Sequence, residues 1–119
     1  MDTKELGFLA ENIAARYLEG RGYEVIDRNY RKPWGEVDII VSKEEVIIFV
    51  EVKSSNRESE GLDPEVRVDW KKIAKIKRVA AFYLESEFGD MDREWQIDIV
   101  SITFNSIEKK ANIKHFKNI

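Results

Sequence analysis

The chain has 119 residues, no cysteine, 36% charged residues and a formal net charge of −3. This length is enough for one core without staples, so we expect a single domain over residues 1–119, and the lack of thiols excludes disulfides and thiolate metal sites. No apolar run reaches the ~18 residues of a membrane span, and the N-terminal residues lack the pattern of a signal peptide, so we expect a cytoplasmic protein with no membrane contact.

Residues 3–20 are predicted to form an amphipathic helix, because apolar residues recur at helical spacing and Gly20 and Gly22 can end it. Glu11 lies on the flank of this helix. Its side chain faces either a cleft or solvent, and the helical wheel slightly favours solvent. A short strand over residues 23–26 and a basic turn over residues 28–35 follow. Arg31 and Lys32 in that turn are candidate nucleic-acid contacts.

Residues 35–41 and 46–53 are predicted to form a β-hairpin, because two strand-like runs flank a short polar connector. If Ser42 pairs with Glu45, then Glu36 faces Glu51. Side chains alternate along each strand, which places four charged residues on one face. They are Glu36, Asp38, Glu51 and Lys53. The opposite face is expected to be wholly apolar, with Val37, Ile39, Val41, Val46, Ile48, Val50 and Val52.

The charged end of this hairpin is a candidate metal site. Like charges across a strand ladder destabilise it, so three carboxylates beside one ammonium favour a divalent cation over ordinary surface decoration. Mg²⁺ prefers a few carboxylates, water and phosphate oxygens. The alternative is a partly exposed strand end with solvated charges.

The second half of the chain is predicted to contain a loop over residues 54–61, a second helix and a further strand over residues 94–104. Asp63, Pro64 and Glu65 have the order of a helix start, and the helix continues to about Glu87 unless it breaks near Asp69. The tail either adds a short strand or frays. The predicted apolar face of this helix comprises Trp70, Ile73, Ala74, Ile76, Val79, Ala80, Tyr83 and Leu84. The order α-β-β-β-α-β predicts a mixed sheet with helices packed on it.

The other side of the second helix carries a basic stripe, which is Arg67, Lys71, Lys75 and Arg78. A stripe of one sign suffers repulsion at helical spacing, and a phosphate backbone would neutralise it. A solvated polar face is an equally good interpretation, and the acidic balance of the whole chain argues mildly against a nucleic-acid binder. Lys72 lies apart from the stripe, where it could reach the sheet.

An acid on one strand and Glu-x-Lys on the next look like the signature of PD-(D/E)xK nucleases, here Asp38 and Glu51-Val52-Lys53. Over about residues 7–100 the chain also resembles the uncharacterised YraN-type family, which is related to Holliday-junction resolvases. The matching segments include Gly7-x-x-Ala10-Glu11-x-x-Ala14, Asn29-Tyr30-Arg31, Gly35-Glu36-Val37-Asp38, Phe49-Val50-Glu51-Val52-Lys53, Lys72 and Ile97-Asp98-Ile99-Val100. The chain departs from the family at Ala10, Ser55 and Gln96, where glycine, arginine and arginine are usual.

The resemblance implies a restriction-endonuclease-like fold, a mixed central β-sheet flanked by α-helices. It implies that Asp38, Glu51 and the Val52 carbonyl bind Mg²⁺ or Mn²⁺, with Lys53 beside them. Glu11 and Glu36 would be secondary catalytic acids. The expected function is a metal-dependent endonuclease acting on branched or damaged DNA, as a homodimer and without a small-molecule cofactor. The alternatives are a non-catalytic nucleic-acid-binding module and a protein-interaction scaffold.

Overall fold

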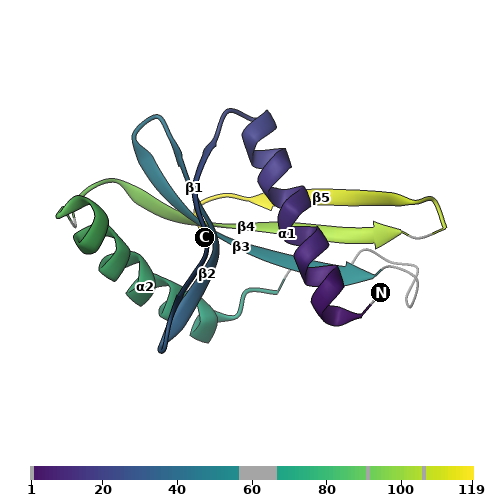
Figure 1. Cartoon of the computed structure of the whole chain (residues 1–119), viewed down its shortest axis with the longest axis horizontal. Coiled ribbons are helices and arrows are strands. Elements are labelled where there is room, and N and C mark those ends of the chain that lie inside the picture. The colour runs from purple at the N-terminus through teal and green to yellow at the C-terminus, as the bar shows by residue number, and fades with distance from the viewer. Residues whose placement is uncertain (1, 57–66, 91, 106) are drawn as a thin grey trace.

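A computed structural model describes residues 2–56, 67–90, 92–105 and 107–119 of the chain (Figure 1). Its elements are α1 (Thr3–Gly20), β1 (Glu24–Lys32), β2 (Gly35–Lys43), β3 (Val46–Asn56), α2 (Trp70–Phe88), β4 (Trp95–Asn105) and β5 (Lys110–Phe116). The predicted order of helices and strands is confirmed, and the tail forms a strand. Neither helix in the described part of the chain is long and apolar enough to cross a membrane.

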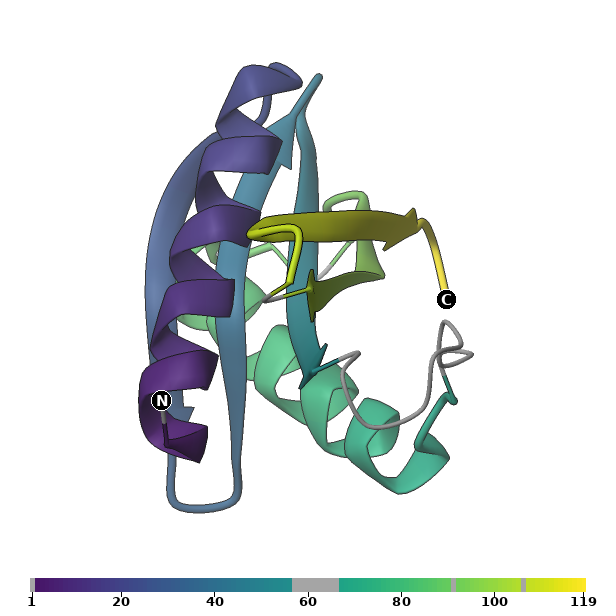
Figure 2. The same cartoon turned by 90° about the vertical axis from the view of Figure 1, so that its right-hand side faces the viewer.

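The strands form one mixed sheet in the order β1-β2-β3-β4-β5. β3 and β4 are parallel and the other neighbours are antiparallel. A parallel pair needs a crossover, and α2 lies in the segment that connects β3 to β4. α1 covers one side of the sheet and α2 lies on the other (Figure 1, Figure 2). This is the mixed α/β arrangement that the sequence predicted.

Two apolar clusters hold these layers together. Under α1, the small residues Ala10, Ala14 and Ala15 are buried against β2, β3 and β4, so the helix approaches the sheet closely. Under α2, six of the predicted apolar residues are buried: Ile73, Ile76, Val79, Ala80, Tyr83 and Leu84. The prediction was wrong for Trp70 and Ala74, which are exposed. Both lie in the first turns of α2, which begins only at Trp70.

The start of α2 differs from the prediction in a way that matters for the basic stripe. Asp69 is the N-cap, and its side chain accepts hydrogen bonds from the backbone N–H groups of Lys71 and Lys72. The helix therefore does not run through Asp69, in agreement with the alternative that allowed a break there, and Arg67 precedes it. The predicted helix start at residues 63–65 lies outside the described residues.

The predicted basic turn over residues 28–35 was wrong, because β1 continues to Lys32 and only residues 33–34 make the turn. Arg31 and Lys32 pair with Glu36 and Gly35 on β2. Backbone hydrogen bonds to β2 extend β1 through this charged segment. Such bonds do not require alternating apolar residues, so the sequence did not reveal this part of the strand.

The predicted register of the β2–β3 hairpin is also wrong. Lys43 pairs with Val46, and Ile40 rather than Asp38 lies opposite Phe49. The turn is the two-residue Glu44–Glu45, with φ of 51° and 69°. Such turns normally contain Asn or Gly, so two glutamates gave no signal for them.

Along β2 the apolar side chains change face at Asp38. Val37 packs in the cluster under α2, whereas Ile39 and Val41 pack in the cluster under α1. The prediction of one continuous apolar face was therefore wrong. On β1, Asn29 has φ of 52° and lies between the residues that pair with Ile39 and Val37. A left-handed residue in a strand interrupts the regular alternation, and asparagine tolerates this conformation better than most residues.

The C-terminal segment is held by a buried polar network around Asp98, which is 0% exposed. Its carboxylate is 2.7 Å from Nε2 of His115 and accepts hydrogen bonds from the Gln96 side chain and the Asn118 N–H. Desolvation alone would raise the pKa of Asp98, but these hydrogen bonds outweigh it and lower the pKa below the ordinary 3.8. The ionised carboxylate therefore stabilises the fold above its unfolded pKa, and this contribution is lost as pH falls through the folded pKa.

We expect Asp98→Ala to lower the free energy of unfolding at neutral pH by about 3 kcal/mol, since several buried donors lose their acceptor. Asp98→Asn keeps one acceptor oxygen and should lose less. Urea unfolding of both variants at neutral pH measures the difference. Equal stability of Asp98→Ala and the parent would show that the network contributes nothing.

Candidate active site

The central feature of the site is a fork where β2 and β3 separate. The two strands pair from Lys43 and Val46 up to Ile39 and Val50. Beyond that point β2 continues beside β1, and β3 continues beside β4. In Figure 1, the hairpin end of β1 and β2 extends downward, while β3 and β4 run to the right. Asp38 and Glu51 are the next residues on the two strands, so they stand where the fork opens.

Asp38 is held at the fork by a backbone contact. The N–H of Val52 donates a hydrogen bond of 2.8 Å to Oδ2 of Asp38, so the side chain bridges the two diverging strands. Burial raises the pKa of Asp38 to about 6. The Val52 N–H and Lys72 oppose this rise, whereas the nearby carboxylates of Glu11 and Glu51 add to it. Asp38 is therefore a desolvated acid with too little positive charge around it.

Glu51 is 2% exposed and forms an ion pair with the ammonium of Lys72, in the first turn of α2. Desolvation lowers the pKa of Lys72, but the hydrogen bond to Glu51 and the charges of Glu51, Asp38 and Glu36 outweigh it and raise the pKa above 10.5. The expectation that Lys72 could reach the sheet is confirmed. Lys72 is the built-in counter-ion of the fork.

Lys53 follows Glu51 by two residues on β3, so strand alternation places both side chains on the same side of the sheet. It is partly buried and makes no ion pair with any residue that the structure describes. The ion-pair partner of Glu51 is Lys72 and not Lys53. Lys53 therefore has no carboxylate partner among the described residues.

Glu11 points into the site, which corrects the slight preference for a solvent-facing side chain. Its side chain is 12% exposed and accepts hydrogen bonds of 3.1 Å from Arg28 and 2.8 Å from Asn29. Glu11 and Asp38 line the same hollow of about 310 Å³ between α1 and the fork, which we call the α1 hollow. Arg28 and Asn29 were not predicted as site residues. Asparagine is compatible with the left-handed conformation of Asn29, but only the contact of β1 with α1 places its amide against Glu11.

Glu36 does not face Glu51, so the prediction of one charged face was wrong. Because the strands separate at Asp38, β3 has no partner for Glu36. Glu36 is 55% exposed and lies 3.3 Å from Arg31, which is 71% exposed. Both line a second hollow of about 700 Å³ between the β1–β2 turn and the start of α2, which we call the α2 hollow.

Within the described residues, no three Asp, Glu or His side chains gather closely enough to hold a metal ion among them. Mg²⁺ needs only one or two carboxylates, because water and phosphate oxygens complete its octahedral shell. Asp38 and Glu51 offer hard oxygen ligands on adjoining strand ends, and the carbonyl of Val52 is a third candidate. The deficit of positive charge at Asp38 fits a cation at this position.

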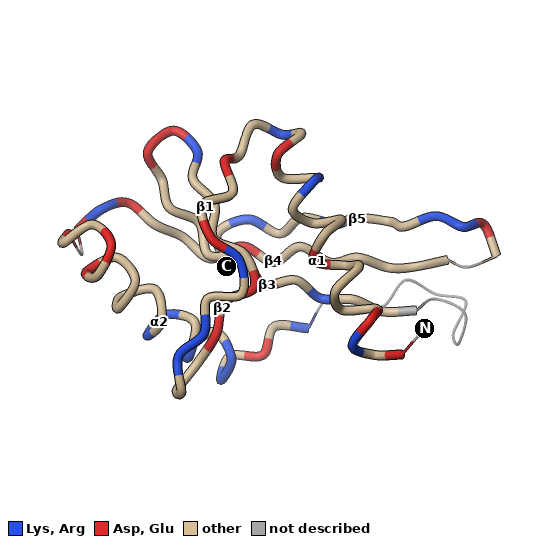
Figure 3. The backbone as a smooth tube through the Cα atoms, in the orientation of Figure 1, with Lys and Arg blue, Asp and Glu red and all other residues tan. Residues whose placement is uncertain are grey.

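Basic residues gather beside the fork (Figure 3). The α2 hollow is lined by Arg31, Lys32, Lys71, Lys72 and Lys75, against the acids Glu36 and Asp69. Arg78 lies over the ring of Trp34, 5.6 Å from its centroid. Lys71, Lys75 and Arg78 are exposed, as the stripe predicted, and Arg67 is exposed ahead of the helix. The stripe therefore borders a hollow that reaches from the turn to Lys72.

A mixed sheet between two helices, with an acid and Glu-Val-Lys meeting where two strands part, defines a protein with the restriction-endonuclease-like fold. The sequence comparisons specify the family. Residues 10–102 match the model of Uncharacterised protein family UPF0102. The chain belongs to this family, which confirms the predicted YraN-type resemblance.

Its relatives match over most of their length. A UPF0102 protein of Fervidobacterium nodosum is 40% identical over 112 residues, which cover 93% of this chain and 78% of the relative. One from Campylobacter fetus is 39% identical and covers 95% and 98%. One from Alkaliphilus oremlandii is 38% identical and covers 98% and 97%. The names of these proteins state no activity.

The raised pKa of Asp38 predicts a pH-dependent effect on stability. A carboxyl whose folded pKa is about 6 and whose unfolded value is 3.8 destabilises the fold as pH rises between those values. Without metal, Asp38→Asn should therefore be more stable than the parent by roughly 2–3 kcal/mol above pH 6. The difference should vanish near pH 4. Urea unfolding in EDTA at several pH values tests this, and a difference independent of pH would contradict it.

Proposed function

We propose that this protein is a metal-dependent DNA endonuclease that hydrolyses phosphodiester bonds at the fork. The observation that carries the proposal is the pairing of a desolvated Asp38 with a buried Glu51 where β2 and β3 part. An acid whose pKa is raised to about 6 costs stability unless a cation is bound, and function is the usual reason for keeping such a group.

The residues of the fork would divide the chemistry among them. Asp38, Glu51 and the Val52 carbonyl would hold Mg²⁺ or Mn²⁺. When bound, such an ion lowers the pKa of water and neutralises charge on a scissile phosphate. Lys53 would stabilise the negative charge that develops on the phosphate or orient the attacking water. Lys72 forms an ion pair with Glu51, and Arg28 and Asn29 hold Glu11 beside Asp38.

DNA would reach the fork across the basic α2 hollow. Lys71, Lys72, Lys75, Arg31 and Lys32 would contact phosphates, which position DNA without reading its bases. Arg67 and Arg78 extend the same surface. The proposal includes the homodimer that the resemblance implies, because two copies would cut paired strands. Light scattering of the purified protein measures its oligomeric state and so tests this part.

Reversing Lys71 and Lys75 to glutamate should weaken binding to every DNA sequence and flatten the slope of log affinity against log salt by about two units. Thermal stability should stay the same, since both side chains are exposed. Fluorescence anisotropy across a salt series provides the measurement. The matched control is Lys109→Glu with Lys110→Glu, two exposed lysines at the end of the β4–β5 turn and the first position of β5. This turn lies away from α2 (Figure 3). If the α2 variant keeps the parent's slope, DNA takes another path.

A nucleic-acid-binding module without turnover is the second candidate. The observation that favours it is the ion pair between Lys72 and Glu51, because an ammonium already neutralises one of the two candidate ligands. In that case the metal would bind weakly, and the hollows would bind DNA without cutting it.

A cleavage screen separates the two candidates. Labelled duplex, nicked, flapped and four-way DNA are incubated with the protein in Mg²⁺, Mn²⁺ or EDTA. We expect cleavage that requires a metal and that is absent from Asp38→Asn protein purified in the same way. Binding to these substrates without metal-dependent cleavage would support the non-catalytic module.

A further inference from the structure

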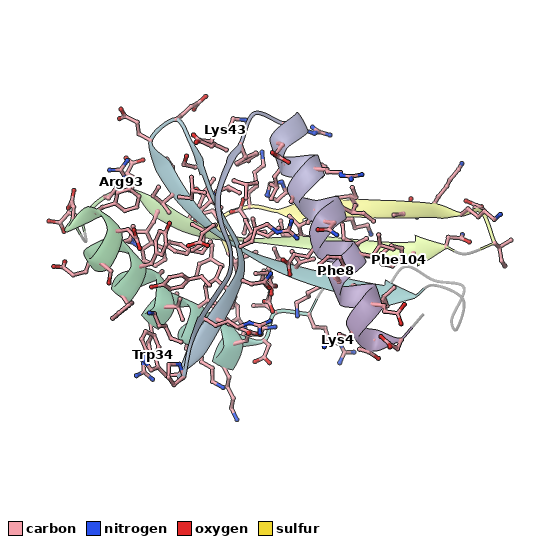
Figure 4. The ribbon with its side chains drawn as sticks, in the orientation of Figure 1. Lys4, Phe8, Trp34, Lys43, Arg93 and Phe104 are labelled. Carbon is pink, nitrogen blue, oxygen red and sulfur yellow. The ribbon has the colours of Figure 1, made fainter. Side chains whose placement is uncertain are left out.

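Phe8 is an aromatic side chain at the mouth of the site that no catalytic role accounts for. It lies on the N-terminal half of α1, as Figure 4 shows, and is 67% exposed. Single exposed apolar side chains are ordinary on protein surfaces. Phe8 differs because it lines the α1 hollow together with Asp38.

The surroundings of Phe8 combine an aromatic surface with phosphate-binding charges. Lys4, one helical turn before Phe8, lines the same hollow, and so does Arg31 from the end of β1. Arg31 also lines the α2 hollow, so the two hollows adjoin at this residue. A strand whose phosphates follow the basic α2 hollow to the fork would therefore continue into the α1 hollow beside Phe8.

The size of the α1 hollow limits what can enter it. At about 310 Å³ it lies at the small end of the range of ligand pockets, roughly 300–1,000 Å³. This is room for about one nucleotide and too little for a duplex. Inside a duplex, moreover, both faces of a base are covered by its stacked neighbours, so a base must leave the stack or already be unpaired to enter this hollow and lie on Phe8.

We propose that Phe8 stacks on an unpaired nucleobase next to the scissile phosphate at the fork, with Lys4 and Arg31 contacting the backbone of that nucleotide. This inference rests on the proposed function and narrows its substrate to DNA with unpaired nucleotides at the cutting point. Stacking on an aromatic side chain is tolerant of sequence, because every base has a π face. The site therefore selects the structure of the DNA rather than its sequence.

Binding experiments in EDTA test the proposal without requiring cleavage. The two probes are a fully paired duplex and the same duplex with a short unpaired flap. Phe8→Ala should lower affinity for the flapped DNA by about 5- to 150-fold, the range expected for loss of one stacked base. Affinity for the paired duplex should change less than twofold, and Phe8→Trp should retain flap binding. With 2-aminopurine in the flap, its fluorescence should be quenched by the parent and not by Phe8→Ala.

Phe88→Ala is the matched control, because Phe88 is a partly exposed phenylalanine at the far end of α2, with the guanidinium of Arg93 4.3 Å from its ring centroid. It should bind both probes as the parent does. The proposal would be overturned if Phe8→Ala lost affinity equally for both probes, or lost affinity for neither. Failure of the endonuclease function appears separately, as an absence of Asp38-dependent cleavage by the parent protein.

Discussion

Asp38→Asn should abolish both metal binding and DNA cleavage. The substitution keeps the shape of the side chain and one oxygen that can accept from Val52, but it removes the charge that a divalent cation needs. Loss of a partner behind a metal ligand already costs 10- to 100-fold in affinity, so loss of a ligand should cost at least about 100-fold. Cleavage should fall by roughly 1,000-fold or more, because the charge stabilisation of the transition state is lost as well.

Glu51→Gln should have the same effect on Mn²⁺ affinity, since Glu51 is the second carboxylate of the fork. Isothermal titration calorimetry with Mn²⁺ and a cleavage assay measure the two quantities. Glu36→Gln is the control, because Glu36 is an exposed acid outside the fork. The Glu36→Gln variant should bind Mn²⁺ with the affinity of the parent. Unchanged affinity in both Asp38→Asn and Glu51→Gln would rule out a metal at the fork.

Replacing either of the two lysines near Glu51 should have a different effect, on cleavage for Lys53 and on stability for Lys72. Lys53→Ala should reduce cleavage by about 100-fold or more, because a charge aimed at the transition state is removed. DNA affinity should fall only slightly, and stability should hardly change, since Lys53 makes no ion pair with a described residue. A Lys53→Ala protein that cuts at close to the parent rate would remove Lys53 from the mechanism.

Lys72→Met should instead destabilise the protein in EDTA. Glu51 is 2% exposed and would be left as a buried charge without its partner. Fully buried pairs cost 3–5 kcal/mol when broken, and because Lys72 is half-exposed we expect about 2 kcal/mol. Added Mn²⁺ should restore much of this loss, since a cation at the fork would replace the missing ammonium. Urea unfolding with and without Mn²⁺ measures both effects, and a loss that Mn²⁺ does not reduce would contradict a metal at Glu51.

Features that depend on near neighbours in the chain were predictable. The spacing of apolar residues located α1, β4 and the buried face of α2, because a helix or strand must turn one side toward a core. The Asp38 and Glu51-Val52-Lys53 pattern singled out the strands that meet at the fork. Strand alternation also placed Lys53 on the same side as Glu51, since that relation spans only two residues.

Contacts between distant segments determined the rest. Registers that differ by two residues bury the same faces, so periodicity alone could not choose the pairing of Lys43 with Val46. The separation of β2 from β3, the left-handed Asn29 and the inward turn of Glu11 arise where β1, β2 and α1 meet. The ion pair of Lys72 with Glu51 forms only because α2 crosses beneath the sheet, and a charge partner twenty-one positions away leaves no period in the sequence.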